Sequence, residues 1–322
     1  MKILILYTGG TFGSSEGTVR RLSAPEFSVV DKYRKENPSA LMEFEERSLD
    51  TLISSENMTI FLWNSLIDAL RKVDFALYDG VIITHGTDTL AYTSALLSVV
   101  LGHVKIPVVL VSSNAPLSSP NANGYDNFRD GVDFIGTCGD YSGVFVTYHQ
   151  NGESHVLLGE KISQSRPFIH SFEHFDGSRF GTMKDGRFFP LSDYKSAVRE
   201  DILDTLPPLT NSVLSVTPYV GLDYSRINFD GGQPVRAVLH GTYHSYTMCV
   251  DQKPQDNPSS YSAEYFLNEC NRRNIALYFA SREEGAEYES GEKLRQLGAK
   301  FISNTSFELG YAQLLAKYGS KT

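Results

Sequence analysis

The sequence contains few cysteines and no pair of them at short spacing. Its three cysteines, Cys138, Cys249 and Cys270, lie far apart, and no Cys-x-x-Cys motif is present. We therefore interpret them as buried, reduced thiols of a protein in a reducing compartment.

Long apolar runs and basic clusters are also missing. The N-terminal apolar run covers only Ile3 to Leu6, too short for the hydrophobic region of a secretory signal, and no segment approaches the length of a membrane-spanning helix. Lysines and arginines never form a run longer than two, and the net charge is −9. This charge argues against a nucleic acid or an anionic membrane as partner. We expect a cytoplasmic protein that binds neither.

The composition is that of a globular protein of two domains. The chain has 322 residues, of which 41% are hydrophobic and 21% charged. We predict an α/β fold: a larger N-terminal domain (1–192) with a parallel-rich sheet flanked by helices, a linker (193–210) containing Pro207-Pro208, and a smaller C-terminal α/β domain (211–322). Apolar runs predict strands at 2–7, 43–49, 81–84, 106–111, 142–148, 154–158, 213–216, 235–239 and 275–280. Helical patterns cover 27–35, 60–73, 90–101, 126–135, 262–273, 291–297 and 306–317.

The segment His85-Gly86-Thr87-Asp88-Thr89 lies between a buried strand and an apolar helix. In an open parallel sheet, ligands bind beyond the carboxyl ends of the strands, and the N-terminus of the following helix favours an anionic group. Asp88 and Thr89 could instead only cap the helix. Capping needs one such residue, whereas this turn supplies several, so it is a candidate site.

A second turn of this kind, Thr8-Gly9-Gly10-Thr11, ends the first predicted strand. Its spacing is neither that of a dinucleotide-binding fingerprint nor that of a phosphate-binding loop. The segment from Ser54 to Thr59 provides a helix cap at Asn57 or Thr59, and its Ser55 and Glu56 are candidates for binding the carboxylate and ammonium of a small amino acid.

Together these segments resemble the bacterial-type asparaginase/glutaminase family, closest to its cytoplasmic type I branch. Thr8-Gly9-Gly10-Thr11 resembles the first family signature, and His85-Gly86-Thr87-Asp88-Thr89 resembles the second. The resemblance covers the whole chain in order. It implies that residues 1–192 form a catalytic domain, that the protein is a homodimer or homotetramer, and that it hydrolyses the side-chain amide of an amino acid without a cofactor or metal.

The resemblance also implies roles for particular residues. Thr11 matches the nucleophile that forms an acyl-enzyme, while Thr87 and Asp88 match the second catalytic group. Ser55 matches a ligand of the substrate α-carboxylate, and Glu56 and Asp88 match groups that meet the α-ammonium. The same comparison places three further residues at the substrate, namely Gly10, Gly86 and Ser113.

Two positions depart from the family pattern. The position of its relay lysine falls at Gln164, which cannot relay a proton as an amine does, while Lys161 lies three residues earlier. A tyrosine of the family's mobile loop falls at Thr18. The leading hypothesis is an amidohydrolase that converts L-asparagine to L-aspartate and ammonia. The alternatives are a protein that binds or senses an acidic amino acid with weak or lost turnover, and an amidase for a modified asparagine.

Overall fold

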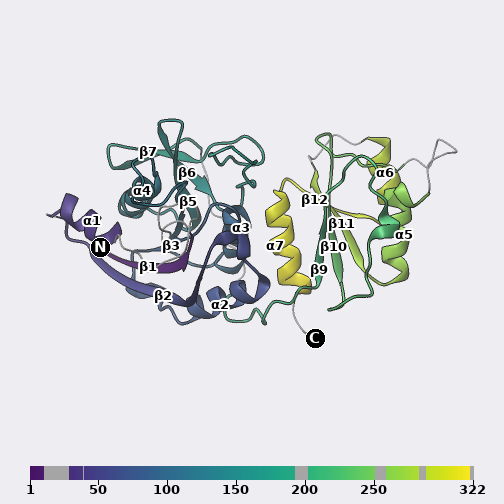
Figure 1. Cartoon of the computed structure of the whole chain (residues 1–322), viewed down its shortest axis with the longest axis horizontal. Coiled ribbons are helices and arrows are strands. Elements are labelled where there is room, and N and C mark those ends of the chain that lie inside the picture. The colour runs from purple at the N-terminus through teal and green to yellow at the C-terminus, as the bar shows by residue number, and fades with distance from the viewer. Residues whose placement is uncertain (11–28, 39, 193–201, 251–258, 283–287, 320–322) are drawn as a thin grey trace. The chain divides into compact units, whose positions relative to one another are not determined.

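The computed structural model describes residues 1–10, 29–38, 40–192, 202–250, 259–282 and 288–319. The chain divides into two compact units, Met1–Leu206 and Pro207–Thr322, and this division lies inside the segment predicted as a linker. Each unit contains a sheet and helices, so the predicted α/β class with a larger and a smaller sheet is confirmed (Figure 1). The assignment of catalysis to residues 1–192 stays a prediction.

The first unit is built on an eight-stranded sheet of order β2-β1-β3-β4-β5-β6-β7-β8. Neighbouring strands from β2 to β5 are parallel, and those from β5 to β8 are antiparallel. The strands are β1 (Lys2–Gly9), β2 (Glu43–Ile53), β3 (Gly80–Thr84), β4 (Pro107–Val111), β5 (Gly143–Gln150), β6 (Glu153–Leu158), β7 (Gly181–Lys184) and β8 (Arg187–Pro190). The helices are α1 (Val29–Glu36), α2 (Ile60–Arg71), α3 (Leu90–Val100) and α4 (Gly124–Thr137).

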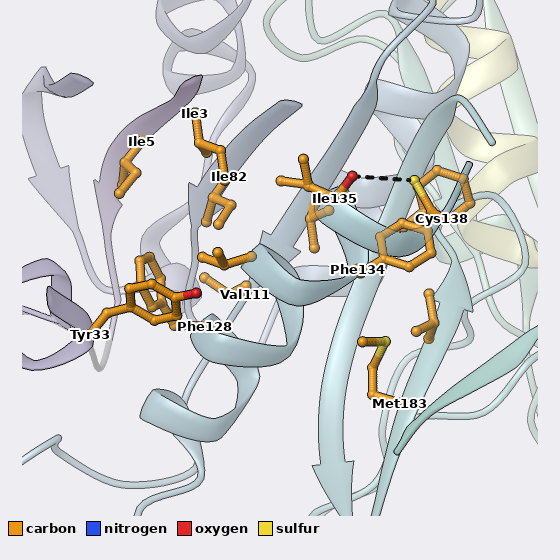
Figure 2. Packing of buried hydrophobic residues seen from close by; sticks show 14 of the residues in the cluster. Ile3, Ile5, Tyr33, Ile82, Val111, Phe128, Phe134, Ile135, Cys138 and Met183 are labelled. Carbon is orange, nitrogen blue, oxygen red and sulfur yellow. Dashed lines mark hydrogen bonds between the residues drawn. The ribbon is translucent and has the colours of Figure 1, made fainter. Parts of the chain in front are cut away.

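The central strands are fully buried because helices cover both faces of the sheet. Ile3, Ile5 and Ile82 pack in one cluster with residues of α1 and α4, among them Tyr33 and Phe128 (Figure 2). Side chains alternate between the faces of a strand, so the intervening residues of β1 and β3 point to the opposite face. Figure 1 shows α3 on that side. All five residues of β3 are buried, as its apolar sequence predicted.

Helix α4 carries a carboxylate that the fold desolvates. Burial, with Asp130 nearby, raises the pKa of Asp133 from 3.8 to about 6, and Arg129 opposes the shift. The folded state therefore holds a proton that the unfolded chain loses near pH 4, and stability falls as the pH rises from about 4 to about 6.

We expect Asp133→Asn to raise the free energy of unfolding at pH 8 by about 1 kcal/mol, a value reduced from the full linkage because solvent screens this partly exposed group. The gain should vanish near pH 4. Urea unfolding at both pH values measures it, with the exposed Asp140→Asn as the matched control. Equal effects of the two substitutions, or a gain independent of pH, would contradict the assignment.

The second unit contains a four-stranded parallel sheet of order β12-β11-β10-β9. Its strands are β9 (Val213–Val216), β10 (Ala237–Gly241), β11 (Ala276–Arg282) and β12 (Lys300–Ser303), and its helices are α5 (Ala263–Arg272), α6 (Glu289–Gln296) and α7 (Phe307–Tyr318). A core of its own surrounds Val238, Phe266 and Phe279. No helix in the described part of the chain is long and apolar enough to cross a membrane.

Two expectations from the sequence need correction. Cys138 and Cys270 are buried as expected, but Cys249 is exposed, so the interpretation of all three cysteines as buried is wrong. Strand β12 was not predicted, because a four-residue segment that begins with a lysine carries too little apolar pattern. Its pairing with β11 organises it instead.

Candidate active site

The two threonine-rich turns lie side by side because β1 and β3 are neighbours in the sheet. The Thr8 hydroxyl donates to the carbonyl oxygen of Thr84 at 2.6 Å, and its backbone N–H donates to the Thr84 hydroxyl at 3.3 Å. Both groups are buried. These bonds join the carboxyl ends of the two strands, so the turns that follow must start from the same edge of the sheet.

Beyond these bonds the turns approach each other backbone to backbone. Gly10 has a φ of +76°, and a Cβ atom built on it would lie 2.4 Å from the Gly86 nitrogen. Gly10 N–H donates to the Ile53 carbonyl at 2.7 Å, which connects β1 to the end of β2 as well. Only glycine permits both the positive φ and this approach.

Ser55 connects the third predicted segment to the same place. It lies in a short 3₁₀ turn (Ser55–Asn57), it is 4% exposed, and a Cβ atom on Gly86 would meet its Oγ at 2.4 Å. Its Oγ accepts from Asp88 N–H at 3.1 Å, and its carbonyl accepts from the Thr89 hydroxyl at 2.9 Å. The Thr89 hydroxyl therefore holds Ser55 and does not cap α3. Thr59, by contrast, caps α2 as expected.

A pocket of about 560 Å³ opens at this junction. It is lined by Gly10, Ser54, Ser55, Glu56, Gly86, Thr87, Asp88, Asn114, Tyr148, Gln164, Ser165, Arg166, Pro167, Phe168, Ile169, His170 and Phe172. Most of the predicted site residues are among them. Thr11 and Thr18 lie outside the described residues, although Thr11 directly follows Gly10. The pocket thus lies at the carboxyl ends of parallel strands, where ligands of such sheets bind.

The two candidates for the relay position have different surroundings. Gln164 lines the pocket, and its side-chain N–H donates to the carbonyl oxygen of Asp88. Lys161 is not among the lining residues. Its ammonium pairs with Asp176 at 2.7 Å, and this lysine and Ser178 hold the pKa of Asp176 near 2, although burial opposes the shift. The group that meets the Thr87–Asp88 turn is therefore an amide.

Ser113 does not reach the pocket. It is fully buried, and its hydroxyl donates to the Ala115 carbonyl at 2.5 Å. Asn114, the next residue, lines the pocket, and its backbone N–H and side-chain oxygen form a reciprocal pair of hydrogen bonds with Asn123 at 2.9 and 3.0 Å. Its place after β4 and its amide side chain were available in the sequence, but the direction of each side chain after a strand was not.

His85 has the surroundings of a structural residue. Its Nδ1 lies 2.7 Å from the Gly86 carbonyl and therefore carries the proton, and its Nε2 has no hydrogen-bond partner among the described residues. Complete burial lowers the pKa of this histidine to about 4. It does not line the pocket, so it supports the turn and is not a base there.

Of the far wall of the pocket, only Gln164 was predicted from the sequence. This wall is formed by residues 164–172, which link the two residues of the isolated bridge between Ile162 and His174. It carries an arginine, a histidine and two large exposed apolar side chains. At its base, Nε2 of His174 accepts from Leu158 N–H at 2.9 Å. Nδ1 of His174 then carries the proton and contacts the Ser178 hydroxyl at 3.0 Å. The apolar pair Phe168-Ile169 lies outside every helix or strand pattern of the sequence, so no pattern predicted its place in the wall.

Three buried histidines should make the fold sensitive to acid. Desolvation lowers the pKa of His85, His174 and His240 to about 4. Each folded-state value lies below the unfolded value near 6.5, so stability is complete above pH 6.5 and is lost as the pH falls toward 4. Each histidine contributes a slope of up to about 1.4 kcal/mol per pH unit.

Melting temperatures between pH 7 and pH 4 test this expectation. The wild-type chain should lose stability steeply below pH 6.5, and His174→Gln, which keeps an acceptor for Leu158, should show a shallower decline. The exposed His170→Gln is the control and should follow the wild type. An identical decline in all three proteins would mean that His174 does not titrate in this range.

Fold and pocket together define a class: a two-unit α/β protein with a polar pocket, lined by hydroxyls and carboxylates, at the carboxyl ends of parallel strands. The family model "Asparaginase, N-terminal" matches residues 2–189. The chain therefore belongs to the asparaginase family, and the resemblance indicated by its two signature turns is confirmed.

Several known proteins are similar to this chain. L-asparaginase 1 of Escherichia coli (strain K12) is 34% identical over an alignment of 264 residues that covers 75% of this chain and 70% of that protein. L-asparaginase of Thermococcus kodakarensis is 32% identical over 174 residues, 53% of this chain and 48% of that protein. One component of the glutamyl-tRNA(Gln) amidotransferase of Thermoplasma acidophilum is 26% identical over 234 residues, 69% of this chain and 54% of that protein. The chain thus spans about half the length of the latter two relatives.

Solved structures show the same fold. The thermostable L-asparaginase from Thermococcus kodakarensis superposes with a TM-score of 0.77 at 21% identity, covering 100% of this chain and 94% of that one. The probable cytoplasmic L-asparaginase from Campylobacter jejuni gives a TM-score of 0.72 at 21% identity, with 98% and 94% covered.

Proposed function

We propose that this protein is an amidohydrolase that converts L-asparagine to L-aspartate and ammonia through a threonine nucleophile. The observation that carries the proposal is the convergence of the two signature turns and Ser55 on one pocket. Family membership supports the reaction class. The resemblance to the cytoplasmic branch further supports a homodimer or homotetramer in the cytoplasm, with no cofactor.

The polar side of the pocket has groups suited to a free amino acid. Glu56 and Asp88 supply carboxylates that can pair with an α-ammonium. The Ser55 oxygen already accepts from Asp88 N–H, which leaves its own hydrogen for an α-carboxylate. Ser55 and Glu56, which are adjacent, can thus serve the two charged groups of the substrate, and Asp88 adds a second carboxylate from the neighbouring turn.

In the proposed reaction the Thr11 oxygen attacks the amide carbon, and its proton is taken up by a neighbouring base. The C–N bond breaks, ammonia leaves with a proton, and an aspartyl ester remains on Thr11. Water then hydrolyses the ester to L-aspartate. The N–H groups of Gly10 and Asp88 already donate to Ile53 and Ser55, so oxyanion stabilisation falls to other donors of the site.

Gln164 changes how the second catalytic group is held. Its amide bonds to the Asp88 carbonyl and can fix the Thr87–Asp88 turn, but it carries no proton that it can exchange near neutral pH. Activation of Thr87 then depends on Asp88 and water. We therefore expect the replacement of the lysine by Gln164 to lower the turnover rate and to leave the geometry of the site unchanged.

Hydroxylamine distinguishes an acyl-enzyme from direct attack by water. With L-asparagine as substrate, increasing hydroxylamine should divert product from L-aspartate to the β-hydroxamate, because both nucleophiles compete for one ester. The sum of the two products should equal the ammonia released. Ammonia release with L-aspartate as the only product at every hydroxylamine concentration would contradict the covalent route.

A binding or sensing protein is the second candidate, and the replacement of the relay lysine by Gln164 favours it. In that case L-aspartate should raise the melting temperature while ammonia is not released. The third candidate is an amidase for a modified asparagine, and the apolar side chains Phe168 and Ile169 in the pocket lining favour it.

A further inference from the structure

The wall formed by residues 164–172 presents an apolar surface beside the polar groups. Phe168 is 97% exposed and Ile169 is 50% exposed, and both line the same pocket as Asp88 and Gln164. Apolar side chains at such exposure on the rim of a polar site are available to contact a ligand. In the binding mode proposed above, a free asparagine contacts Ser55, Glu56 and Asp88 and leaves Phe168 and Ile169 uncovered.

This wall is built firmly at its base. The Phe172 N–H and carbonyl bond to both ends of the buried Gln150 amide, at 2.7 and 2.9 Å, and its ring packs edge-on against Tyr148 with centroids 5.0 Å apart. Nearer the tip, the Ser165 hydroxyl donates to the Ile169 carbonyl at 2.6 Å. The exposed residues therefore project from an ordered turn.

The backbone at the tip is also strained. Phe168 has a φ of +65°, a conformation that glycine and asparagine adopt readily and that an aromatic residue rarely adopts. Strain of this kind concentrates at functional sites, where the side chain is needed at that position. Because the Phe168 ring is exposed, its burial contributes nothing to the stability of the fold that could offset the strain.

From these observations, and resting on the proposed function, we infer that the site also accepts an asparagine whose side-chain amide nitrogen carries an apolar group, which lies against Phe168 and Ile169. The α-carboxylate and α-ammonium are taken by Ser55, Glu56 and Asp88, so the amide nitrogen is the position left for an extension. Gln164 begins this wall and bonds to Asp88, which keeps the wall beside the reacting end. Cleavage of the C–N bond then releases L-aspartate and a primary amine in place of ammonia.

The test compares L-asparagine with N4-benzyl-L-asparagine by measuring L-aspartate formation. Phe168→Asn removes the ring and suits the positive φ. We expect it to lower kcat/KM for the benzyl substrate about tenfold, the lower end of what an apolar group contributes in a pocket, and to leave that for L-asparagine within about twofold. Leu41→Asn, which replaces a residue that is 94% exposed and does not line the pocket, should change neither value.

The outcomes separate this inference from the proposed function. Turnover of L-asparagine without turnover of the benzyl substrate would overturn the inference alone. So would equal losses for both substrates in Phe168→Asn, or a changed oligomeric mass, since either assigns the ring a structural role. Absence of L-aspartate from both substrates would overturn the proposed function as well.

Discussion

Replacing Thr11 by alanine is expected to lower ammonia release from L-asparagine by at least about 10³-fold. The proposed reaction begins with attack by the Thr11 oxygen, and in Thr11→Ala this position of the signature turn no longer carries a hydroxyl. Loss of a nucleophile removes the covalent route altogether, and only the slow background supported by binding and polarisation remains. The fold should be unaffected, because the substitution removes only a hydroxyl and a methyl group.

The control is Thr11→Ser, which keeps the oxygen and should retain measurable turnover. Melting temperatures of all three proteins show whether each is folded. Ammonia release by Thr11→Ala within tenfold of the wild type would assign the nucleophile elsewhere.

Gly10→Ala is expected to destabilise the protein by about 2–5 kcal/mol and to abolish turnover. A φ of +76° costs an alanine about 1–2 kcal/mol, and overlap inside a packed region adds about 1–3 kcal/mol. The new Cβ would meet backbone atoms of His85 and Gly86, at 2.7 and 2.4 Å, which cannot move aside as a flexible side chain can. The two turns would have to separate, and the pocket would lose its geometry.

Gly152→Ala provides the matched control. Gly152 has a similar φ of +79°, but nothing lies within 4 Å of its Cβ position, so only the conformational cost of about 1–2 kcal/mol applies. Urea unfolding gives both free energies, and ammonia release should be normal in Gly152→Ala. Equal destabilisation by the two substitutions would show that the close approach of the turns is not what glycine serves at position 10.

The meeting of the two turns could be predicted because it follows from a general rule. Residues 8–10 end one buried strand and residues 85–88 follow another, and the carboxyl ends of neighbouring parallel strands share one edge of the sheet. Turns and helix caps could also be predicted, because each depends on only a few residues that are adjacent in the sequence. Asn151-Gly152 forms the predicted hairpin turn, and Thr59 caps its helix.

Features that depend on tertiary packing could not be predicted in this way. Ser113 and Asn114 both follow β4, but Ser113 packs against Gly124 while Asn114 lines the pocket, and the sequence does not distinguish the two. The wall carrying Phe168 depends on the clamp between Phe172 and Gln150, residues 22 apart in the sequence. No periodicity or motif reports such a contact.

The central claim is that the protein hydrolyses the amide of L-asparagine, and the most direct test measures ammonia and L-aspartate formed by the wild-type chain, alongside its melting temperature with added L-aspartate. We predict that both products appear in equal amounts. A rise in melting temperature with no ammonia from L-asparagine would contradict the claim and would leave a pocket that binds an acidic amino acid without turning it over.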